Sequence, residues 1–234
     1  MRIAIMQPYF FPYIGYFQLM NAAGEFIVYD NIQYSKKGWI NRNRFLVNGK
    51  PAYFTITLKN ESDFLDISER HISPEWKTGK IKTLNRIFEA YRKAPYIGSV
   101  YPMIETCFMY EDDNLFGYIF NSLITASVFL GITTPLVISS TVAADHSLRS
   151  ADRVISICHS RKASGYLNPE GGIGLYDSDY FSSRGISLQF IKSTGVIYRQ
   201  FDNDFVPSLS VIDVMMFNSP DRIRDFLEKA FEII

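Results

Sequence analysis

The densest group of chemically capable side chains lies between Asp30 and Arg44, where the sequence reads DNIQYSKKGWINRNR. The last six of these residues contain two amides, two guanidinium groups and one indole. The guanidinium group of Arg42 or Arg44 could hold a phosphate or carboxylate through two parallel hydrogen bonds, while Trp39 stacks on a flat ring. A surface loop seldom needs an exposed indole between such groups, so we favour a cradle for a nucleotide or nucleotide-sugar over a solvated loop before a hairpin. The candidate substrate-binding residues here are Asp30, Gln33, Trp39, Asn41, Arg42 and Asn43.

A second candidate segment is the aromatic turn QPYFFPYIGYFQ, residues 7–18. Its two prolines stiffen the chain, and Gly15 allows a close backbone approach where a helix is expected to begin. The free N–H groups at such a helix start can hold a phosphate or carboxylate. A rigid turn packed by its aromatic rings is an equally good interpretation. The candidates here are Gln7, Tyr13, Gly15 and Tyr16.

The same turn resembles that of the nucleotidyltransferases, in which a strand leads through a proline to His-x-Gly-His. The corresponding positions here read Tyr13-Ile14-Gly15-Tyr16, so both histidines are replaced by tyrosines. A phenol with an ordinary pKa of about 10 donates a hydrogen bond but carries no positive charge for a phosphate in the transition state. The resemblance therefore supports the fold and weakens the case for adenylyl or cytidylyl transfer.

A third candidate segment spans residues 166–177 and has three glycines within four residues. Its backbone N–H groups could surround an anion, although the segment matches neither the dinucleotide fingerprint nor the phosphate-binding loop. A plain tight turn explains the glycines equally well. The candidates here are Tyr166, Gly171 and Gly172.

The sequence assigns no catalytic residue. His146 is a weak candidate because it sits between Asp145 and Ser147, but adjacent residues rarely point at the same atom. His71 and His159 are expected on ordinary helices. No spacing of His, Cys and carboxylate residues matches a metal site, neither cysteine has a convincing histidine partner, and the cofactor is unknown.

These segments need a scaffold, and the first elements form a βαβ unit. An apolar run at 3–6 predicts a strand, residues 15–23 a helix and residues 26–29 a second, parallel strand. The Asn48-Gly49 pair then predicts a hairpin turn between strands at 45–47 and 52–58. Ser73-Pro74 indicates a helix start, with the serine as its cap.

The remaining pattern alternates helices and strands around a helical insertion at about 74–130. We predict one domain over residues 1–234, with an α/β fold built on a parallel, Rossmann-like (nucleotidyltransferase-like) sheet. Ligands bind beyond the carboxyl ends of such strands, so the candidate segments should meet at one rim. The predicted elements are helices at 74–93, 96–110 and 113–130, ended by Gly131, then a strand at 134–139, a helix at 148–162, a strand at 165–167, a helix near 177–183, a strand at 187–191 and a closing helix at 220–231.

The composition excludes some classes of partner. Lys plus Arg equals Asp plus Glu, 24 against 24, so no overall field attracts nucleic acid or an anionic membrane. Cys107 and Cys158 lie in apolar contexts typical of free buried thiols, which favours a reducing cytoplasm. No targeting segment is evident, and the apolar stretch at 115–132 is broken by polar residues, so no membrane insertion is expected.

Four segments in this order, residues 6–16, 30–43, 166–176 and 209–214, resemble the WbqC-like family of bacterial proteins. The resemblance implies a role in O-antigen, capsule or related surface-polysaccharide synthesis, with glycine or amino-acid transfer as a suggested activity. It brings no established catalytic residues. The leading hypothesis is a transferase acting on a nucleotide-linked sugar or amino sugar. The alternatives are a nucleotidyltransferase-like enzyme and a non-catalytic nucleotide- or sugar-binding protein.

Overall fold

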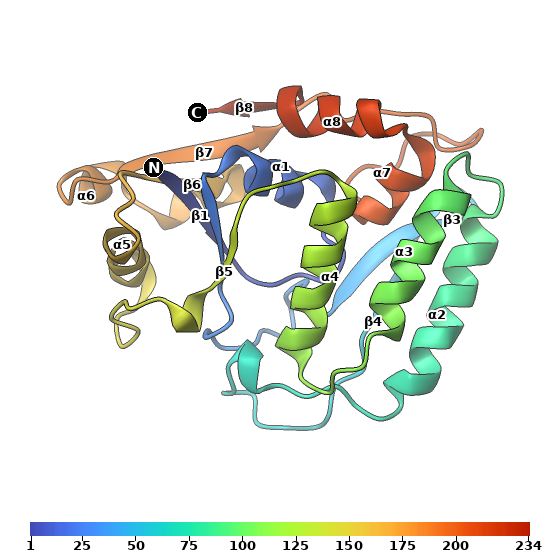
Figure 1. Cartoon of the computed structure of the whole chain (residues 1–234), viewed down its shortest axis with the longest axis horizontal. Coiled ribbons are helices and arrows are strands. Elements are labelled where there is room, and N and C mark those ends of the chain that lie inside the picture. The colour runs from blue at the N-terminus through green and yellow to red at the C-terminus, as the bar shows by residue number, and fades with distance from the viewer.

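The computed structural model describes all 234 residues, and its main sheet has six strands in the order β5-β2-β1-β6-β7-β8 (Figure 1). The strands β5, β2, β1, β6 and β7 run parallel, and β8 is antiparallel to β7. By position in the chain this order is three-two-one-four-five-six, the Rossmann order, so the predicted parallel α/β sheet is confirmed. The strands are β1 (Arg2–Met6), β2 (Glu25–Val28), β5 (Leu136–Ile138), β6 (Gly165–Pro169), β7 (Ser187–Ser193) and β8 (Phe231–Ile233).

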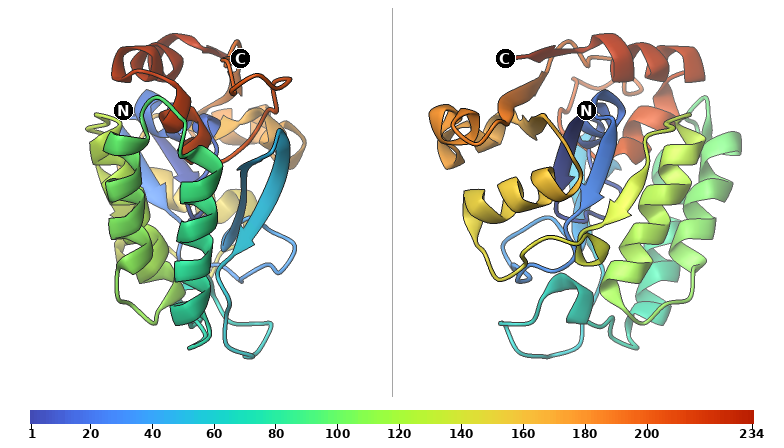
Figure 2. Two further views of the ribbon diagram at one scale, coloured as in Figure 1. Left: turned by 90° about the vertical axis from the view of Figure 1, so that its right-hand side faces the viewer. Right: turned by 60° about the vertical axis from the view of Figure 1, so that its left-hand side comes forward.

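The sheet separates two hydrophobic cores, and successive side chains of a strand face one core and then the other. In β1, Ile3 and Ile5 belong to the smaller core, whereas Ala4 belongs to the larger one. The right-hand view of Figure 2 shows α5 on one side of the strands and the helices α2 to α4 on the other. The smaller core is covered by α5 (Ser150–Ser160) and α6 (Ser178–Ser182), and the larger by α1 (Ile14–Ala22), α2 (Trp76–Tyr91), α3 (Ile97–Met109), α4 (Leu115–Phe129), α7 (Val211–Phe217) and α8 (Pro220–Lys229).

The long connection between β2 and β5 carries a hairpin followed by three helices. The hairpin joins β3 (Arg42–Val47) to β4 (Lys50–Thr55) through Asn48 and Gly49, whose φ angles are 50° and 74°. The predicted turn is therefore confirmed, although β3 begins three residues earlier than expected and β4 begins two residues and ends three residues earlier. The three predicted helices are α2, α3 and α4, and Gly131 follows the last with a φ of 72°. Three short 3-10 turns complete the chain at Ile67–Glu69, Ser139–Thr141 and Glu170–Leu175.

Four details of the prediction were wrong. Ser73 does not cap α2, because that helix begins three residues later and no side chain caps it. His71 lies in an extended segment bridged to Asn114 and not in a helix. The closing helix ends at Lys229, since the last residues pair with β7 as β8. The helix α7 was not predicted because its sequence, VIDVMMF, is buried on nearly every side and shows no polar face.

None of the helices combines the length and the apolar character that a membrane crossing requires.

A candidate binding cleft at the carboxyl edge of the sheet

The largest hollow near the carboxyl ends of the strands has a volume of about 500 Å³. It lies beside the switch point between β1 and β6, where ligands bind in sheets of this order. Three strands contribute through the residues that follow them, and a loop near residue 207 closes the remaining side. The lining consists of Tyr13, Ile14, Glu170, residues 193–198, Phe205, residues 207–209 and Val214.

The Tyr13 ring occupies one wall because the next helix begins with a small residue. A β-carbon at Gly15 would stand 2.4 Å from Cε2 of Tyr13, so only glycine lets this ring lie over the start of α1. Burial raises the pKa of the Tyr13 hydroxyl, and the nearby carboxylate of Glu170 raises it further. The hydroxyl thus stays protonated and can donate a hydrogen bond. No side chain caps the amino end of α1.

Two guanidinium groups lie near the cleft, although they are not among its lining residues. Arg42 and Arg44 lie over the ring of Trp39, with their central carbons 5.2 Å and 5.4 Å from its centroid. Arg44 also donates a 3.0 Å hydrogen bond to the carbonyl of Ser208, which lines the cleft. Neither arginine forms an ion pair, but Arg42 donates a 2.7 Å hydrogen bond to the carbonyl of Lys37, and the Nε–H of each arginine is buried without a partner. The second terminal nitrogen of each guanidinium group has no partner in the chain and is the donor that an anion could use.

Tyr9 connects the Tyr13 wall to the arginine pair. Its ring lies 6.4 Å from the ring of Trp39, and its hydroxyl interacts electrostatically with Arg44 and with Tyr13. Burial raises the pKa of Tyr9 far above its ordinary value despite the arginines. The aromatic turn, the arginine pair and the start of the glycine turn thus lie around one rim.

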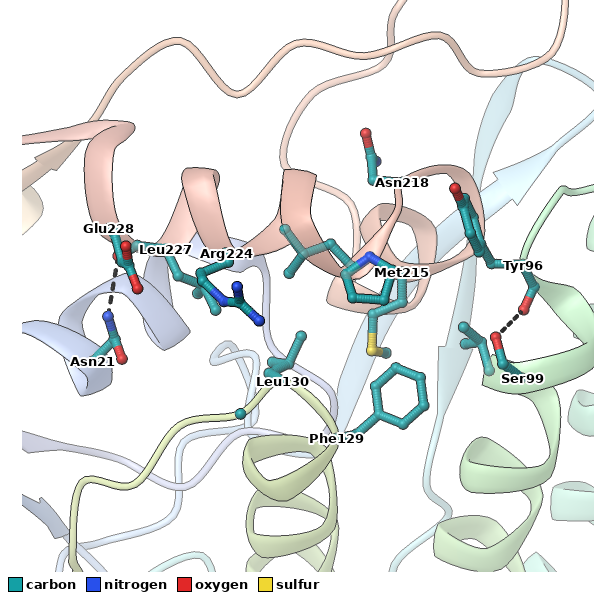
Figure 3. Close-up of a pocket in the computed structure, with 14 residues that line it drawn as sticks. Asn21, Tyr96, Ser99, Phe129, Leu130, Met215, Asn218, Arg224, Leu227 and Glu228 are labelled. Carbon is teal, nitrogen blue, oxygen red and sulfur yellow. Dashed lines mark hydrogen bonds between the residues drawn. The ribbon is translucent and has the colours of Figure 1, made fainter.

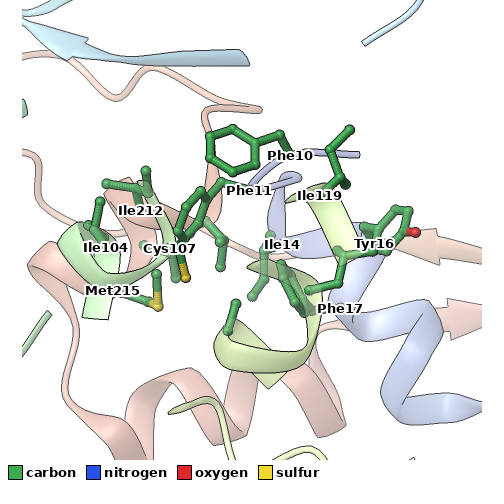
Figure 4. Packing of buried hydrophobic residues seen from close by; sticks show 14 of the residues in the cluster. Phe10, Phe11, Ile14, Tyr16, Phe17, Ile104, Cys107, Ile119, Ile212 and Met215 are labelled. Carbon is green, nitrogen blue, oxygen red and sulfur yellow. The ribbon is translucent and has the colours of Figure 1, made fainter. Parts of the chain in front are cut away.

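Two segments near the cleft, the turn after β1 and the loop before α7, each hold one residue in a strained conformation. Phe11 has a φ of 46° and Ser208 a φ of 56°, the left-handed region that non-glycine residues rarely adopt. The carbonyl of Phe11 accepts hydrogen bonds from the amide of Asn43 and, at 2.7 Å, from the hydroxyl of Ser210. Figure 4 shows Phe10 and Phe11 among the buried side chains of the larger core. Strain of this kind persists where the surroundings enforce it, and it clusters at functional sites.

A buried carboxylate lies behind the cleft. Asp213 is fully buried and accepts hydrogen bonds from the hydroxyls of Tyr91 and Tyr198, both at 2.7 Å, and from the amide of Gln200 at 2.6 Å. Burial raises the pKa of Asp213, although the three donors act in the opposite direction. Since Tyr198 lines the cleft, this carboxylate fixes the orientation of a cleft hydroxyl.

Four of the predicted binding residues point into the protein instead of the cleft. Asn41 accepts from the Tyr34 hydroxyl and donates to the carbonyl of Ile56, each at 2.8 Å. Tyr16 donates to the carbonyl of Gln7 at 2.9 Å. These side chains are buried and do not face a ligand in the cleft. The four are Tyr16, Asn41, Asn43 and Tyr166.

Other predicted residues lie on the same edge but outside the cleft. Asp30 is buried and accepts the backbone N–H of Ser140 at 2.9 Å, which ties the end of β2 to the end of β5. Gln33 is exposed and donates to the carbonyl of Asp63 on a separate loop. Gln7 and Gly171 are exposed, whereas Gly172 is buried against Asn168, whose Nδ2 leaves no room for a β-carbon.

Both ring nitrogens of His146 are engaged. Nδ1 lies 3.1 Å from the amide nitrogen of Asn31, and Nε2 lies 2.9 Å from the carbonyl of Val142. Arg153 approaches the same Nδ1 at 3.4 Å. The imidazole is consequently used to join the segments after β2 and β5, and it does not line the cleft.

Of the predicted site residues only Tyr13 lines the cleft, and the sequence interpretation missed Glu170 and Tyr198 in its lining and Asp213 behind it. Glu170 was passed over in favour of the glycines that follow it, and Tyr198 carries no local signal. Asp213 did carry a local signal, because it is the only charged residue in the apolar run from Leu209 to Phe217. No group of three or more His, Cys, Asp or Glu side chains is arranged to hold a metal ion.

A different pocket, of about 370 Å³, lies at the opposite edge of the sheet (Figure 3). It is formed where α1 and α4 end, near Asn21 and Leu130, and where α8 crosses them. Its wall includes the side chains of Phe129 and Met215, and it shares no residue with the cleft.

One family of known proteins matches most of the chain. The WbqC-like protein family matches residues 7–225 of the chain. An uncharacterized protein of Mycobacterium tuberculosis is 25% identical over 232 residues, which cover 97% of each chain. No solved structure matches the chain.

Proposed function

The chain belongs to the WbqC-like protein family, and from this premise we propose that it is a transferase that acts on a nucleotide-linked sugar or amino sugar. Its role would be in the synthesis of bacterial surface polysaccharide, such as O-antigen or capsule, in the cytoplasm. The transferred group would be an amino acid such as glycine. The cleft at the carboxyl edge of the sheet would be the substrate site.

The observation that carries this proposal is a pair of guanidinium groups near the cleft that have no carboxylate partner. Arg42 and Arg44 stack on Trp39, and Arg44 reaches the cleft through its hydrogen bond to the carbonyl of Ser208. A nucleotide-sugar carries phosphate charge between two ring systems. Two guanidinium groups would hold the phosphates, while Trp39, which already stacks on Tyr53 and carries both arginines over its ring, would hold these groups in position.

The other cleft residues support group transfer. The carboxylate of Glu170 lies at the end of β6, where it could accept a proton from an attacking hydroxyl or amine. The neutral hydroxyl of Tyr13 could donate to developing negative charge, and the uncapped start of α1 favours an anion nearby.

A nucleotidyltransferase-like activity is the second candidate, favoured by the order of the parallel strands. In that interpretation Tyr13 and Tyr16 would replace two histidines. Only Tyr13 reaches the cleft, since Tyr16 is buried and its hydroxyl is bonded to Gln7. This arrangement leaves one neutral group where two imidazoles would act, so we rank this activity below sugar-nucleotide transfer. A non-catalytic protein that binds a nucleotide or sugar is the third candidate.

A thermal-shift experiment separates these activities. The wild-type protein is heated with UDP-N-acetylglucosamine, GDP-mannose or dTDP-glucose, and separately with ATP or CTP plus magnesium. A ligand at one hundred times its dissociation constant should stabilise the protein by about 2.7 kcal/mol. Stabilisation by the nucleotide-sugars supports our proposal, and stabilisation by the nucleoside triphosphates alone supports the nucleotidyltransferase. Binding without turnover when acceptors are supplied supports the third candidate.

Two variants test the anion site itself. Arg42→Ala and Arg44→Ala should each reduce the stabilisation by nucleotide-sugar while leaving the unliganded melting temperature nearly unchanged. The matched control is Arg184→Ala, which removes another arginine stacked on an aromatic ring, 3.4 Å from the centroid of Tyr180 on α6. Equal stabilisation of all three variants would remove the basis of the proposal.

A further inference from the structure

A separate pocket of about 290 Å³ lies within the helical segment. It is enclosed by the start of α2, the loop that follows α3 and the start of α4. It shares no residue with the cleft at the carboxyl edge. Its lining consists of Ile72, Ser73, Trp76, Lys77, Lys80, Tyr110, Glu111, Asp112, Asp113 and Tyr118.

The unusual member of this lining is Lys80. The residue is only 7% exposed, and its ammonium group forms no hydrogen bond and no ion pair within the chain. The aliphatic stem is buried, while the ammonium nitrogen keeps contact with solvent through the pocket. An anion that enters the pocket would gain a charge-assisted hydrogen bond from this ammonium group.

The opposite wall carries the complementary charge. Glu111, Asp112 and Asp113 follow α3, and none of them forms an ion pair with Lys80 or its neighbour Lys77. Their carboxylates do not converge on a point where they could share a metal ion. The pocket thus keeps a positive wall and a negative wall apart across an open space.

Asp112 of the acidic wall is held in place by the start of α4. One carboxylate oxygen of Asp112 accepts the backbone N–H of Asn114 at 2.8 Å. The other stands only 2.0 Å from where a β-carbon at Gly117 would be, so this glycine makes room for it. The carboxylate of Asp112 is consequently fixed by the fold, whereas those of Glu111 and Asp113 beside it are exposed at the mouth of the pocket.

Aromatic rings form the rest of the pocket. Trp76 donates its indole N–H to the hydroxyl of Tyr118 at 3.2 Å, and Tyr118 donates to the carbonyl of Phe108 at 2.7 Å. Both rings are thereby fixed, and their apolar faces suit an aliphatic or aromatic group. A nearby ring face also attracts a cation.

We propose that this pocket binds a small zwitterion that carries one carboxylate and one ammonium group, the chemical class of the free amino acids. The carboxylate accepts a charge-assisted hydrogen bond from Lys80, and the ammonium group faces Glu111 and Asp113. The remaining carbon atoms pack on Trp76 and Tyr118. The volume lies at the lower end of the range for small-molecule sites, about 300–1,000 Å³, and the acidic wall repels a phosphate ester.

The test is a thermal-shift and calorimetric screen of the wild-type protein with the twenty standard amino acids at millimolar concentration. At least one should stabilise the protein. Its carboxamide, which lacks the negative charge, and its deamino acid, which lacks the positive charge, should each bind about ten- to a hundredfold more weakly, as expected for one lost charge-assisted contact.

Variants identify the pocket. Lys80→Met keeps most of the aliphatic side chain, so its unliganded melting temperature should equal or exceed that of the wild type while amino-acid binding is lost. Asp113→Asn should weaken binding, whereas Lys93→Met, at an exposed lysine just after α2, should not. Arg42→Ala should leave this binding intact, so the outcome is independent of the cleft. The proposal is overturned by a screen without any stabilising amino acid, by undiminished binding in Lys80→Met, or by a lower melting temperature of that variant.

Discussion

The hydroxyl of Tyr198, on the wall of the cleft, donates a 2.7 Å hydrogen bond to the buried carboxylate of Asp213. Tyr91 and Gln200 complete the set of donors, and no cation balances the charge. A tyrosine hydroxyl that donates inward keeps its lone pairs directed away from the carboxylate. The network therefore makes the Tyr198 hydroxyl a hydrogen-bond acceptor toward the cleft.

We expect Asp213 to make stability depend on pH in an unusual direction. Burial raises the pKa of Asp213 in the folded state above the unfolded value of about 3.9, so folding favours the protonated form. Its contribution to stability is complete below that value and is lost as pH rises through the raised pKa, by at most about 1.4 kcal/mol per pH unit. The measurement is urea unfolding of the wild type and of Asp213→Asn at a series of pH values from 4 upward. The difference between their free energies of unfolding, wild type minus variant, should fall as the pH rises. Asp179→Asn, at an exposed carboxylate without a side-chain partner, is the control, and a relative stability that rises with pH would contradict the assignment.

Asn43→Ala should destabilise the protein by about 1–3 kcal/mol in urea unfolding, the usual cost of leaving a buried polar group without its partner. The amide of Asn43 holds the carbonyl of Phe11, whose backbone is in the left-handed region, and Ser210 alone would remain. Asn60→Ala removes an exposed amide without a side-chain hydrogen bond and should change stability by less than about 0.5 kcal/mol. Similar values for the two variants would show that the turn does not need this contact.

The strands of the parallel sheet and most of the helices were predictable because the sequence signals for them are local. Short apolar runs alternate with helical periods, and the Asn48-Gly49 turn and Gly131 act through their own backbone angles. The elements that were missed depend on tertiary contacts. The strand β8 exists because Phe231 and its neighbours pair with β7, a contact that no short window of sequence reveals.

The candidate site was predictable by segment but not by residue. Asn41 and Arg42 are adjacent in the sequence, yet one is buried and bonded to Tyr34 while the other faces outward over Trp39. Which side chain faces outward depends on the register of β3, and a shift by one residue exchanges the two faces. The sequence could identify the polar segment, whereas only the pairing of β3 with β4 decided which of its side chains are buried and which face outward.

Both thiols should be unreactive in the native protein. Burial raises the pKa of Cys107 and of Cys158 to about 12, and neither side chain is accessible. Because the thiolate is the reacting species, Ellman's reagent should label neither cysteine in buffer and both in denaturant. Rapid labelling of one thiol in the folded protein would place that cysteine at the surface.

Gly15→Ala should weaken nucleotide-sugar binding without touching the arginines. The new β-carbon would stand 2.4 Å from the ring of Tyr13, so the ring must leave the cleft wall. We expect a loss of stability of about 1–3 kcal/mol from overpacking, together with a reduced thermal shift by the nucleotide-sugar that stabilises the wild type.

The control for this change is the same substitution in a helix with free space. At Gly98, in α3, a β-carbon would meet nothing within 4 Å, so Gly98→Ala should raise stability by up to about 1 kcal/mol and leave binding unchanged. Tyr13→Phe then separates the ring from its hydroxyl, because it keeps the wall and removes only the donor. Full binding by Gly15→Ala would mean that the Tyr13 ring is not part of the substrate site. Weak binding by both Gly15→Ala and Tyr13→Phe would assign the contact with the substrate to the Tyr13 hydroxyl.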